Sequence, residues 1–523
     1  MSGRVGTIVN TSTEGTDLDL GGIFDALLAI VGSPYNLLLL FLAVPIGMFF
    51  GAIPGLGGKL GIVLVIPFVF GMDAVSGALF LIAMHSVVHT GGSVPSILFG
   101  VPGTGPDAAT IVDGLPMTRN GEAGRALGAA FGASGVGGVI GGMFLLALLP
   151  LLQPIVLAFS PAEFFLLALF GITLIAMLSG DSLAKGLMVG FFGLMMAFVK
   201  LDPQTGIERY TFGQLFIWDG IDIIAAVLGI FAIPEMISLG AAGGSMAGDS
   251  KVKASYGLRG VLRGIGDVFR HWGLTIRTSI IGAFIGMIPG LGGDAASWIC
   301  YGHAAQSSKT PERFGKGAVE GVIAPETANN SKEGGSLLPT LFFAVPGSSG
   351  MAILLGAFVM LGIQPGPALA LPQNMDIVWV LIWGLMLANV LAVIMFIIVA
   401  PGLGYLSYVR GNLLIPFVLV LAFLGAFLAI RAWENMVLLL AMGLLGYFLK
   451  KYHWPRPPFV IGLILGPIAE DSFHKAMALW GPSFLLRPGA LVMSSLIVLT
   501  IGIYVYRLLR HKQAPEWMRE DDD

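Results

Sequence analysis

Long apolar segments recur along almost the whole chain, and few charged residues interrupt them. Only 11% of the residues are charged, whereas soluble domains carry about a quarter. A helix needs about 20 apolar residues to cross the hydrocarbon core of a bilayer. Segments of roughly that length lie at 126–150, 163–179, 376–400, 414–430 and 488–506. The sequence therefore predicts an all-α polytopic membrane protein with roughly 10–13 transmembrane segments.

The charge and cysteine content of the sequence bear on disulfide formation, on nucleic-acid binding and on orientation in the membrane. Cys300 is the only cysteine, which argues against a disulfide framework and a Cys-x-x-Cys site. The polar first 17 residues lack the apolar core of a cleavable signal peptide. A formal net charge of −3 without a long basic run gives no indication of nucleic-acid binding. The positive-inside rule places the basic stretch 241–275 and the basic tail in the cytoplasm, so residues 201–214 are expected to form an outside loop.

The motif "PGLGG" occurs at residues 54–58 and again at residues 289–293, 235 residues later. Beyond it, residues 70–104 align with residues 314–348 at a constant offset of 244 and without a gap. This register pairs Gly91 with Gly335 and the sequence "VPG" with a second "VPG". Two homologous halves are therefore predicted, and an inverted relationship between them is favoured because it brings equivalent broken helices in from opposite sides.

The duplication divides the chain into five parts. They are a polar N-terminal segment (1–20), a first transmembrane repeat (21–240), a basic cytoplasmic linker (241–275), a second transmembrane repeat (276–507) and a cytoplasmic tail (508–523). Gly- and Pro-broken segments at matching positions of two repeats are typical of the binding site of secondary transporters. The alternative is that these glycines only allow helices to pack closely.

The two "PGLGG" turns are candidates for an anion site. A helix that restarts after such a turn presents unpaired N–H groups and a positive dipole end. The backbone residues predicted to form this site are Gly55, Gly57, Gly58, Gly290, Gly292 and Gly293. Lys59 follows the first turn as a possible counter-ion of a carboxylate, and Asp294 follows the second as a possible cation ligand or proton carrier. Both charges could instead lie at wet helix ends or pair with each other.

A second break is predicted in each half at "GGS" and "PGT" or "PGS". Hydroxyl groups beside a helix break either donate to a substrate carboxylate or cap the helix, and both roles remain open. The candidate residues are Gly91, Gly92, Ser93 and Thr104 in the first half, and Gly335, Ser336 and Ser348 in the second.

The stretch "APETANNSKEGG" is the most polar part of the second repeat. Asn329 and Asn330 offer oxygens for a monovalent cation and amide groups for substrate. Glu326, Lys332 and Glu333 are expected near the site, although Lys332 and Glu333 could as easily form a solvated helix end. Asp107 and Asp113, beside "PGT", are expected to be loop or cap residues. In the first half the equivalent positions of the asparagines are His85 and Ser86, and His89 follows one turn later. His85 and His89 are candidates for proton handling rather than for a metal, because no third ligand accompanies them.

Several motifs together resemble the large membrane subunit of the tripartite tricarboxylate transporters. They are "PGLGG", "VPGTGPDAATIVDGLPM", "NGEAGRALG", "APETANNSKEGG" and "LGIQPGP". The likeness runs from about residue 20 to about residue 480. It implies a multi-pass protein of the bacterial inner membrane whose partners are a small four-helix membrane subunit and a periplasmic substrate-binding protein. It also implies coupling to Na⁺ or H⁺ and no cofactor.

The residues and the resemblance together predict a secondary transporter for small di- or tricarboxylates. A passive channel or an uncoupled carrier of another organic anion is the alternative. An enzyme is not expected, because the sequence offers no nucleophile–base pair or metal constellation.

Overall fold

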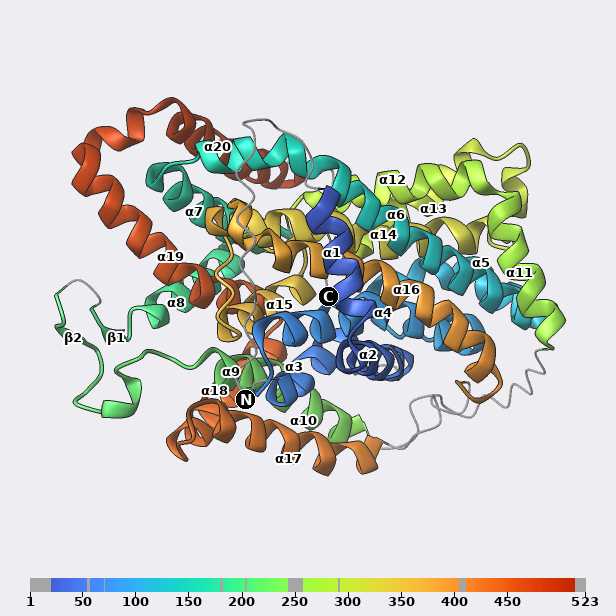
Figure 1. Ribbon diagram of the computed structural model, residues 1–523, viewed down its shortest axis with the longest axis horizontal. Coiled ribbons are helices and arrows are strands. Elements are labelled where there is room, and N and C mark those ends of the chain that lie inside the picture. Colours follow the sequence, from blue (N-terminus) through green and yellow to red (C-terminus); the bar gives the residue numbers. More distant parts are fainter. Residues whose placement is uncertain are drawn as a thin grey trace.

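The computed structural model describes most of the chain as a bundle of helices (Figure 1). The described residues are 20–53, 57–69, 71–178, 182–202, 205–242, 257–289, 292–403 and 411–512. Within them one short hairpin, β1 (Lys200–Leu201) paired with β2 (Glu208–Arg209), is the only sheet. The predicted all-α class is confirmed.

The helices of the first half run from α1 to α10. Their bounds are α1 (Leu20–Val31), α2 (Pro34–Ala52), α3 (Gly57–Val69), α4 (Ala74–Phe99), α5 (Ala108–Arg119), α6 (Ala123–Ala158), α7 (Pro161–Leu178), α8 (Leu183–Ala197), α9 (Ile223–Val227) and α10 (Ile233–Ala242). A short 3₁₀ turn, η1 (Gly105–Asp107), precedes α5, and a π-helical stretch (Leu228–Ala232) joins α9 to α10.

The second half contains α11 to α20. Their bounds are α11 (Leu258–Arg270), α12 (Trp272–Met287), α13 (Gly292–Ser307), α14 (Glu320–Phe343), α15 (Ser349–Met360), α16 (Met375–Leu403), α17 (Gly411–Ile430), α18 (Glu434–Lys451), α19 (Pro457–Trp480) and α20 (Pro488–Lys512). Short 3₁₀ turns lie between several of them, at Leu215–Ile217, Pro311–Arg313, Pro367–Ala370, Pro372–Asn374 and Gly481–Leu486.

Four helical stretches of the described residues are long and apolar enough to span a bilayer, namely α2, α4, α6 and Pro372–Ile398. The bent pair formed by Pro457–Leu486 and Pro488–Gly502 is a possible fifth. Other apolar helices, such as Trp272–Met287, are shorter. The predicted number of 10–13 membrane crossings is larger than the number of long apolar helices among the described residues, so it stays a prediction.

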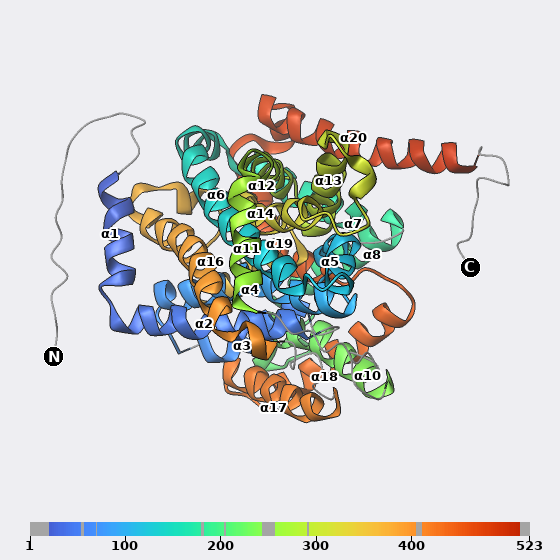
Figure 2. The same cartoon turned by 90° about the vertical axis from the view of Figure 1, so that its right-hand side faces the viewer.

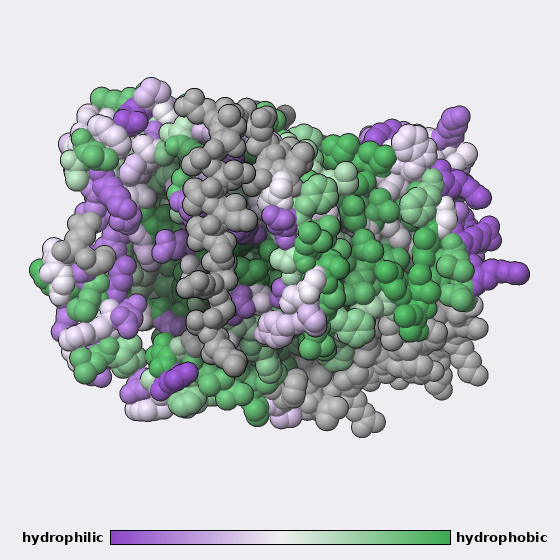
Figure 3. Space-filling view, viewed as in Figure 1, coloured by the Kyte–Doolittle hydropathy of each residue, from purple (hydrophilic) through white to green (hydrophobic). Residues whose placement is uncertain are grey.

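The two ends of the long axis carry different features (Figures 1 and 2). The β1–β2 hairpin projects at the left end of Figure 1, and α11 lies at the right end. On this face polar side chains gather towards both ends, with hydrophobic surface between them (Figure 3). The helix α11 exposes the apolar residues Leu258, Leu262 and Phe269 among arginines, as expected for a helix at a membrane surface.

Glycines allow α2 to pack against α4 and α12 to pack against α14 at backbone distance. A Cβ atom at Gly51 would lie 1.8 Å from the carbonyl oxygen of Val88, and one at Gly286 would lie 2.2 Å from that of Lys332. These two contacts occupy equivalent positions in the aligned halves. Close approach of this kind requires small residues, and the agreement supports the predicted duplication.

The long helix α6 also packs on α14 through glycine. A Cβ atom at Gly141 would lie 2.5 Å from the carbonyl oxygen of Ser331, and one at Gly334 would lie 2.1 Å from the carbonyl oxygen of Gly141. The helix α14 is therefore in backbone contact with both α6 and α12.

The ends of α4 and α14 are equivalent as well. The helix α4 stops at Gly100, with φ of 70°, and α14 stops at Ala344, with φ of 54°. In both cases the N–H group of this residue donates to a proline carbonyl, Pro95 in α4 and Pro339 in α14. The left-handed conformation ends each helix because it turns the chain away from the helical path.

The breaks lie only partly where the sequence predicts them. The chain is interrupted between Ala52 and Gly57 and between Met287 and Gly292, at the two "PGLGG" motifs. The two "GGS" motifs, by contrast, lie inside the continuous helices α4 and α14. The second break therefore lies within the predicted segments 91–104 and 334–348, but at their "VPG" ends: the glycines of "GGS" serve close packing, and the helices end at Gly100 and Ala344.

Candidate substrate and ion site

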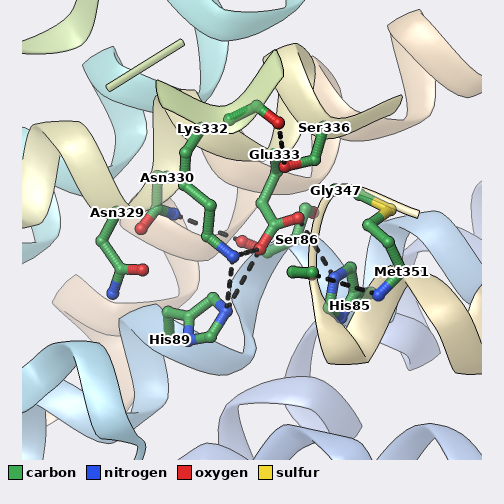
Figure 4. A network of polar contacts seen from close by, with 12 residues as sticks. His85, Ser86, His89, Asn329, Asn330, Lys332, Glu333, Ser336, Gly347 and Met351 are labelled. Atoms are coloured by element: carbon green, nitrogen blue, oxygen red, sulfur yellow. Dashed lines mark hydrogen bonds and ion pairs between the residues drawn. The ribbon is translucent and has the colours of Figure 1, made fainter. Parts of the chain in front are cut away.

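A cluster of buried polar side chains lies where α4 faces α14 (Figure 4). His85 and His89 are one turn apart on α4, so both rings point to the same side. Between them lies Glu333 of α14, with Oε2 3.1 Å from His85 Nε2 and Oε1 3.1 Å from His89 Nε2. The side chain of Glu333 is fully buried. The two halves of the chain thus share one buried carboxylate.

Lys332 adds a positive charge to this cluster. Its ammonium group forms an ion pair with Glu333 and lies 3.4 Å from His89 Nε2, and only 2% of the residue is exposed. The alternative of a solvated helix end for Lys332 and Glu333 is therefore wrong, because both side chains point into the helix contact. Ionisable groups at this depth are costly and are commonly functional in membrane proteins.

A chain of hydrogen bonds continues from His89 into the loop after α4. His89 Nδ1 lies 3.0 Å from Thr104 Oγ1, and Thr104 donates its hydroxyl proton to Asp107 Oδ2 at 2.7 Å. Because that proton is committed to Asp107, the Thr104 oxygen is left to accept from the N–H group of His89. Asp107 also accepts from the backbone N–H of Thr104 at 2.8 Å, which fixes the loop.

Asn329 joins the far end of this chain. Its amide group donates to Asp107 Oδ1 at 3.3 Å, while its buried Oδ1 has no protein partner in the described part of the chain. A Cβ atom at Gly293, at the start of α13, would lie 2.7 Å from this oxygen and 2.9 Å from Lys332 Cε. The helix start after the second "PGLGG" therefore reaches the cluster, as predicted, and Gly293 leaves room beside Asn329 and Lys332.

Asn330 has a different environment. Its amide group donates to Asn389 Oδ1 at 2.6 Å, to Thr90 Oγ1 at 2.9 Å and to the carbonyl oxygen of Ser86 at 3.3 Å. These contacts tie α14 to α4 and α16. A role in holding helices together explains them, and binding of substrate or Na⁺ by Asn330 stays a prediction.

The predicted hydroxyl residues are mostly engaged with backbone. Ser93 donates to the carbonyl oxygen of His89 at 3.3 Å, Ser336 donates to that of Gly286 at 3.1 Å, and Ser348 caps α15 by accepting from Met351 N at 3.2 Å. The capping alternative therefore describes Ser348. Thr104 combines a cap with a direct bond to His89.

The predicted glycines on α4 and α14 have packing roles. A Cβ atom at Gly92 would lie 1.9 Å from Asp107 Oδ2, so only glycine admits the carboxylate there. Gly91 and Gly335 lie against the carbonyl oxygens of Met48 and Ala283 at equivalent positions. Their contribution is to the shape of the site.

Four predicted residues cannot be placed in this way. Gly55 and Gly290 lie outside the described residues, as do the side chains of Lys59 and Asp294. Gly57 and Gly58 open α3, and Gly292, with φ of 62°, opens α13. Among the described residues no group of three His, Cys, Asp or Glu side chains could hold a metal ion.

From the sequence, Glu333 is expected near the site without an assigned role, and Asp107 is expected to be a loop or helix-cap residue. Glu333 aligns with His89 at the constant offset of the two halves, which is a reason to expect contact near a symmetry axis. Asp107 offered no such signal, because a carboxylate after "PGT" is equally typical of a helix cap.

Comparison with known proteins places the chain. The model of the tripartite tricarboxylate transporter TctA family matches residues 37–461. An uncharacterized 52.8 kDa protein in the TAR-I ttuC' 3' region of Agrobacterium vitis is 29% identical over 498 residues, covering 94% of this chain and 97% of the relative. An uncharacterized protein in the TAR-II ttuC' 3' region of the same organism is 28% identical over 246 residues, covering 46% of this chain and all of the relative. No solved structure matches the chain. The chain belongs to the tripartite tricarboxylate transporter TctA family.

Proposed function

We propose that this protein is the large membrane subunit of a secondary transporter that takes up small di- or tricarboxylates across the bacterial inner membrane. Na⁺ or H⁺ would drive the uptake, a periplasmic binding protein would deliver the substrate, and a small four-helix subunit would complete the complex. The observation that carries this proposal is the buried cluster of Lys332, Glu333, His85 and His89 between α4 and α14. Its residues come from both halves of the chain, as expected for a repeat-built transporter.

The chemistry of the cluster suits a carboxylate. Lys332 supplies an ammonium group, which forms charge-assisted hydrogen bonds with carboxylate oxygens. In the described structure Glu333 forms an ion pair with that ammonium group, so a substrate carboxylate would replace the Glu333 carboxylate as its partner when the cluster opens. Three donors would then face the substrate, namely Lys332 and the N–H groups of the two histidines.

His89 would adjust the charge of the cluster. A neutral ring that donates through Nδ1 to Thr104 leaves Nε2 as an acceptor for Lys332, whereas a doubly protonated ring donates through Nε2 to Glu333. Protonation would therefore draw Glu333 towards His89 and release Lys332 for an anion. His85, His89, Asn329, Asn330 and Asp294 remain candidates for ion coupling, and the "PGLGG" helix starts remain candidates for anion binding.

The test is uptake into proteoliposomes that hold this protein with its small subunit and are supplied with the binding protein. Labelled citrate, succinate and malonate would be offered under an imposed Na⁺ gradient and, separately, under a proton gradient. Saturable uptake that depends on one gradient is expected. Flux that rises without saturation and ignores both gradients would instead identify a channel, and absence of carboxylate flux under both gradients would reject the substrate class.

A further inference from the structure

Glu326 is a second buried carboxylate, and it lies outside the cluster of Lys332 and Glu333. It projects from α14, and its side chain is fully buried. Thr110 of α5 donates to its Oε1 at 2.6 Å, and Ser134 of α6 donates to its Oε2 at 3.0 Å. Ser93 of α4 donates its hydroxyl proton to the carbonyl oxygen of His89, so beside Glu326 its oxygen can accept a hydrogen bond from a protonated carboxyl group. Three helices thus surround one carboxyl group with hydroxyls.

No Lys, Arg or His of the described residues lies within ion-pair distance of Glu326. An unpaired carboxylate is strongly disfavoured at such depth, so the group needs either a proton or a cation. By contrast, two other buried carboxylates of this region accept from charged groups or from backbone N–H groups. Glu333 is bonded to Lys332 and both histidines, and Asp113 accepts two backbone N–H groups and the hydroxyl of Tyr301.

Several charged groups on the elements around α14 are bonded to partners other than Glu326. On η1, Asp107 is bonded to Thr104 and Asn329. On α6, Arg125 pairs with Asp267 and Glu122. The Asp294 side chain, on α13, is not among the described side chains. The remaining titratable or charged groups on these elements are His85 and His89 on α4, Asp113 and Arg119 on α5, Arg277 on α12, Cys300, Tyr301 and His303 on α13, and Glu320, Lys332 and Glu333 on α14 itself.

The distances favour a proton over a metal cation. Oxygen atoms 2.6 and 3.0 Å apart are in direct hydrogen-bond contact. A hard cation such as Ca²⁺ keeps its oxygen ligands about 2.3–2.6 Å from the metal, so those oxygens stand further apart. A carboxyl O–H, by contrast, fits among hydroxyls that both donate and accept.

The position of Glu326 connects it to the substrate cluster. Along α14 it is followed by Asn329 one turn later and by Glu333 two turns later, all on one face of the helix. At the equivalent position of the first half lies the apolar and fully buried Ile82. The carboxyl group is therefore a feature of the second half alone, which fits one ion site for each chain.

We infer that Glu326 is the site that carries the coupling proton of transport, held by Thr110, Ser134 and Ser93. This inference rests on the proposed function. The step is a protonation: the carboxylate accepts H⁺ from one side of the membrane, becomes a neutral carboxyl group, and gives the same H⁺ to the other side. The described state holds the group away from water, so α14 must move against α4 or α5 to release the proton.

The experiment compares wild type with Glu326→Gln in the same proteoliposomes, using labelled citrate, succinate and malonate. The glutamine keeps the size and the hydrogen bonding of the group but cannot exchange a proton. Accumulation driven by a proton gradient should fall roughly tenfold or more, while exchange of internal for external substrate, which moves no net proton, should remain measurable. Glu326→Asp should recover part of the accumulation, because it restores a titratable group.

Two matched variants sharpen the result. Glu320→Gln, six residues earlier on α14 and paired with the half-exposed Arg313, should accumulate substrate like wild type. His89→Gln should lose exchange and accumulation together, because His89 belongs to the substrate cluster. Accumulation by Glu326→Gln at the wild-type level would overturn the inference, and so would accumulation that needs only Na⁺.

A spectroscopic measurement covers the case in which transport itself fails. Infrared difference spectra of wild type minus Glu326→Gln, recorded across the pH range in which both are folded, should show the C=O band of a protonated carboxylic acid. Absence of that band at every pH would overturn the inference. If the band is present but wild type exchanges no carboxylate, the proposed function fails and the proton site stands.

Discussion

The side chains of His89 and Glu333 touch each other across the contact between α4 and α14, with Nε2 3.1 Å from Oε1 (Figure 4). The two residues are 244 residues apart, which is the offset that aligns the two halves of the sequence. Asn330 and the carbonyl oxygen of Ser86 form a second contact with the same separation. Equivalent residues of two repeats can meet only close to the axis that relates them, so this axis would pass through the polar cluster.

Lys332 is expected to be necessary for transport. Lys332→Gln removes the ammonium group that faces Glu333, so carboxylate uptake should fall roughly tenfold or more. It also leaves a buried carboxylate without its strongest partner, which should lower the free energy of unfolding by about 3–5 kcal/mol. The double variant Lys332→Gln/Glu333→Gln should recover much of the thermal stability but no uptake. Normal uptake by the single variant would contradict the role of Lys332.

The two neighbouring asparagines should behave differently. Asn330→Ala deletes hydrogen bonds to Asn389 and Thr90 and should destabilise the protein by about 1–3 kcal/mol. Asn329→Ala loses one long hydrogen bond and the amide oxygen beside Gly293, so its melting temperature should stay closer to that of wild type while uptake falls. Thermal unfolding and uptake of both variants provide the check. The reverse pattern would show that Asn329 is the structural residue.

Glycine at position 335 should be required for the contact between α12 and α14. In Gly335→Ala the new methyl group would lie 1.9 Å from the carbonyl oxygen of Ala283, and overpacking of this kind costs about 1–3 kcal/mol or more. Gly302→Ala on α13 is the matched control, because no atom lies within 4 Å of its Cβ position. Monodispersity and melting temperature in detergent would be measured. Equal behaviour of the two variants would disprove the close approach.

The hairpin and α11 should face opposite sides of the membrane. Phe212, near β2, is 87% exposed, and Phe269 of α11 is 65% exposed. In a Cys300→Ser background, Phe212→Cys should react with a membrane-impermeant maleimide added to cells whose outer membrane is opened. Phe269→Cys should react only after the inner membrane is permeabilised, because the basic residues around α11 belong in the cytoplasm. Labelling of both from one side would reject the predicted orientation.

The sequence predicted the helical class and the "PGLGG" interruptions well, because both follow from local properties. Apolar runs with few charges leave little choice except helices in a bilayer. A proline beside several glycines ends a helix through backbone preferences that need no tertiary partner.

The position of the "GGS" motifs inside continuous helices could not be predicted from local sequence. Glycine disfavours a helix by about 1 kcal/mol for each residue, yet Gly91 and Gly92 lie within α4. Their close neighbours, the carbonyl oxygen of Met48 and the carboxylate of Asp107, come from other elements. Burial of Lys332 and Glu333 was likewise invisible, because a Lys–Glu pair has the same sequence at a wet helix end and between two packed helices.

The backbone contacts of Gly141 and Gly334 bear on how such a protein could work. Where a glycine of one helix lies against a backbone carbonyl oxygen of another, no side chain separates the two backbones. Sliding one helix along the other would therefore force main-chain atoms together. The helices α6, α12 and α14 should consequently travel as one piece. Lys332, Glu333 and Glu326 would then move together with these three helices. A gate would open where the three helices contact other helices through side chains, because such contacts can rearrange.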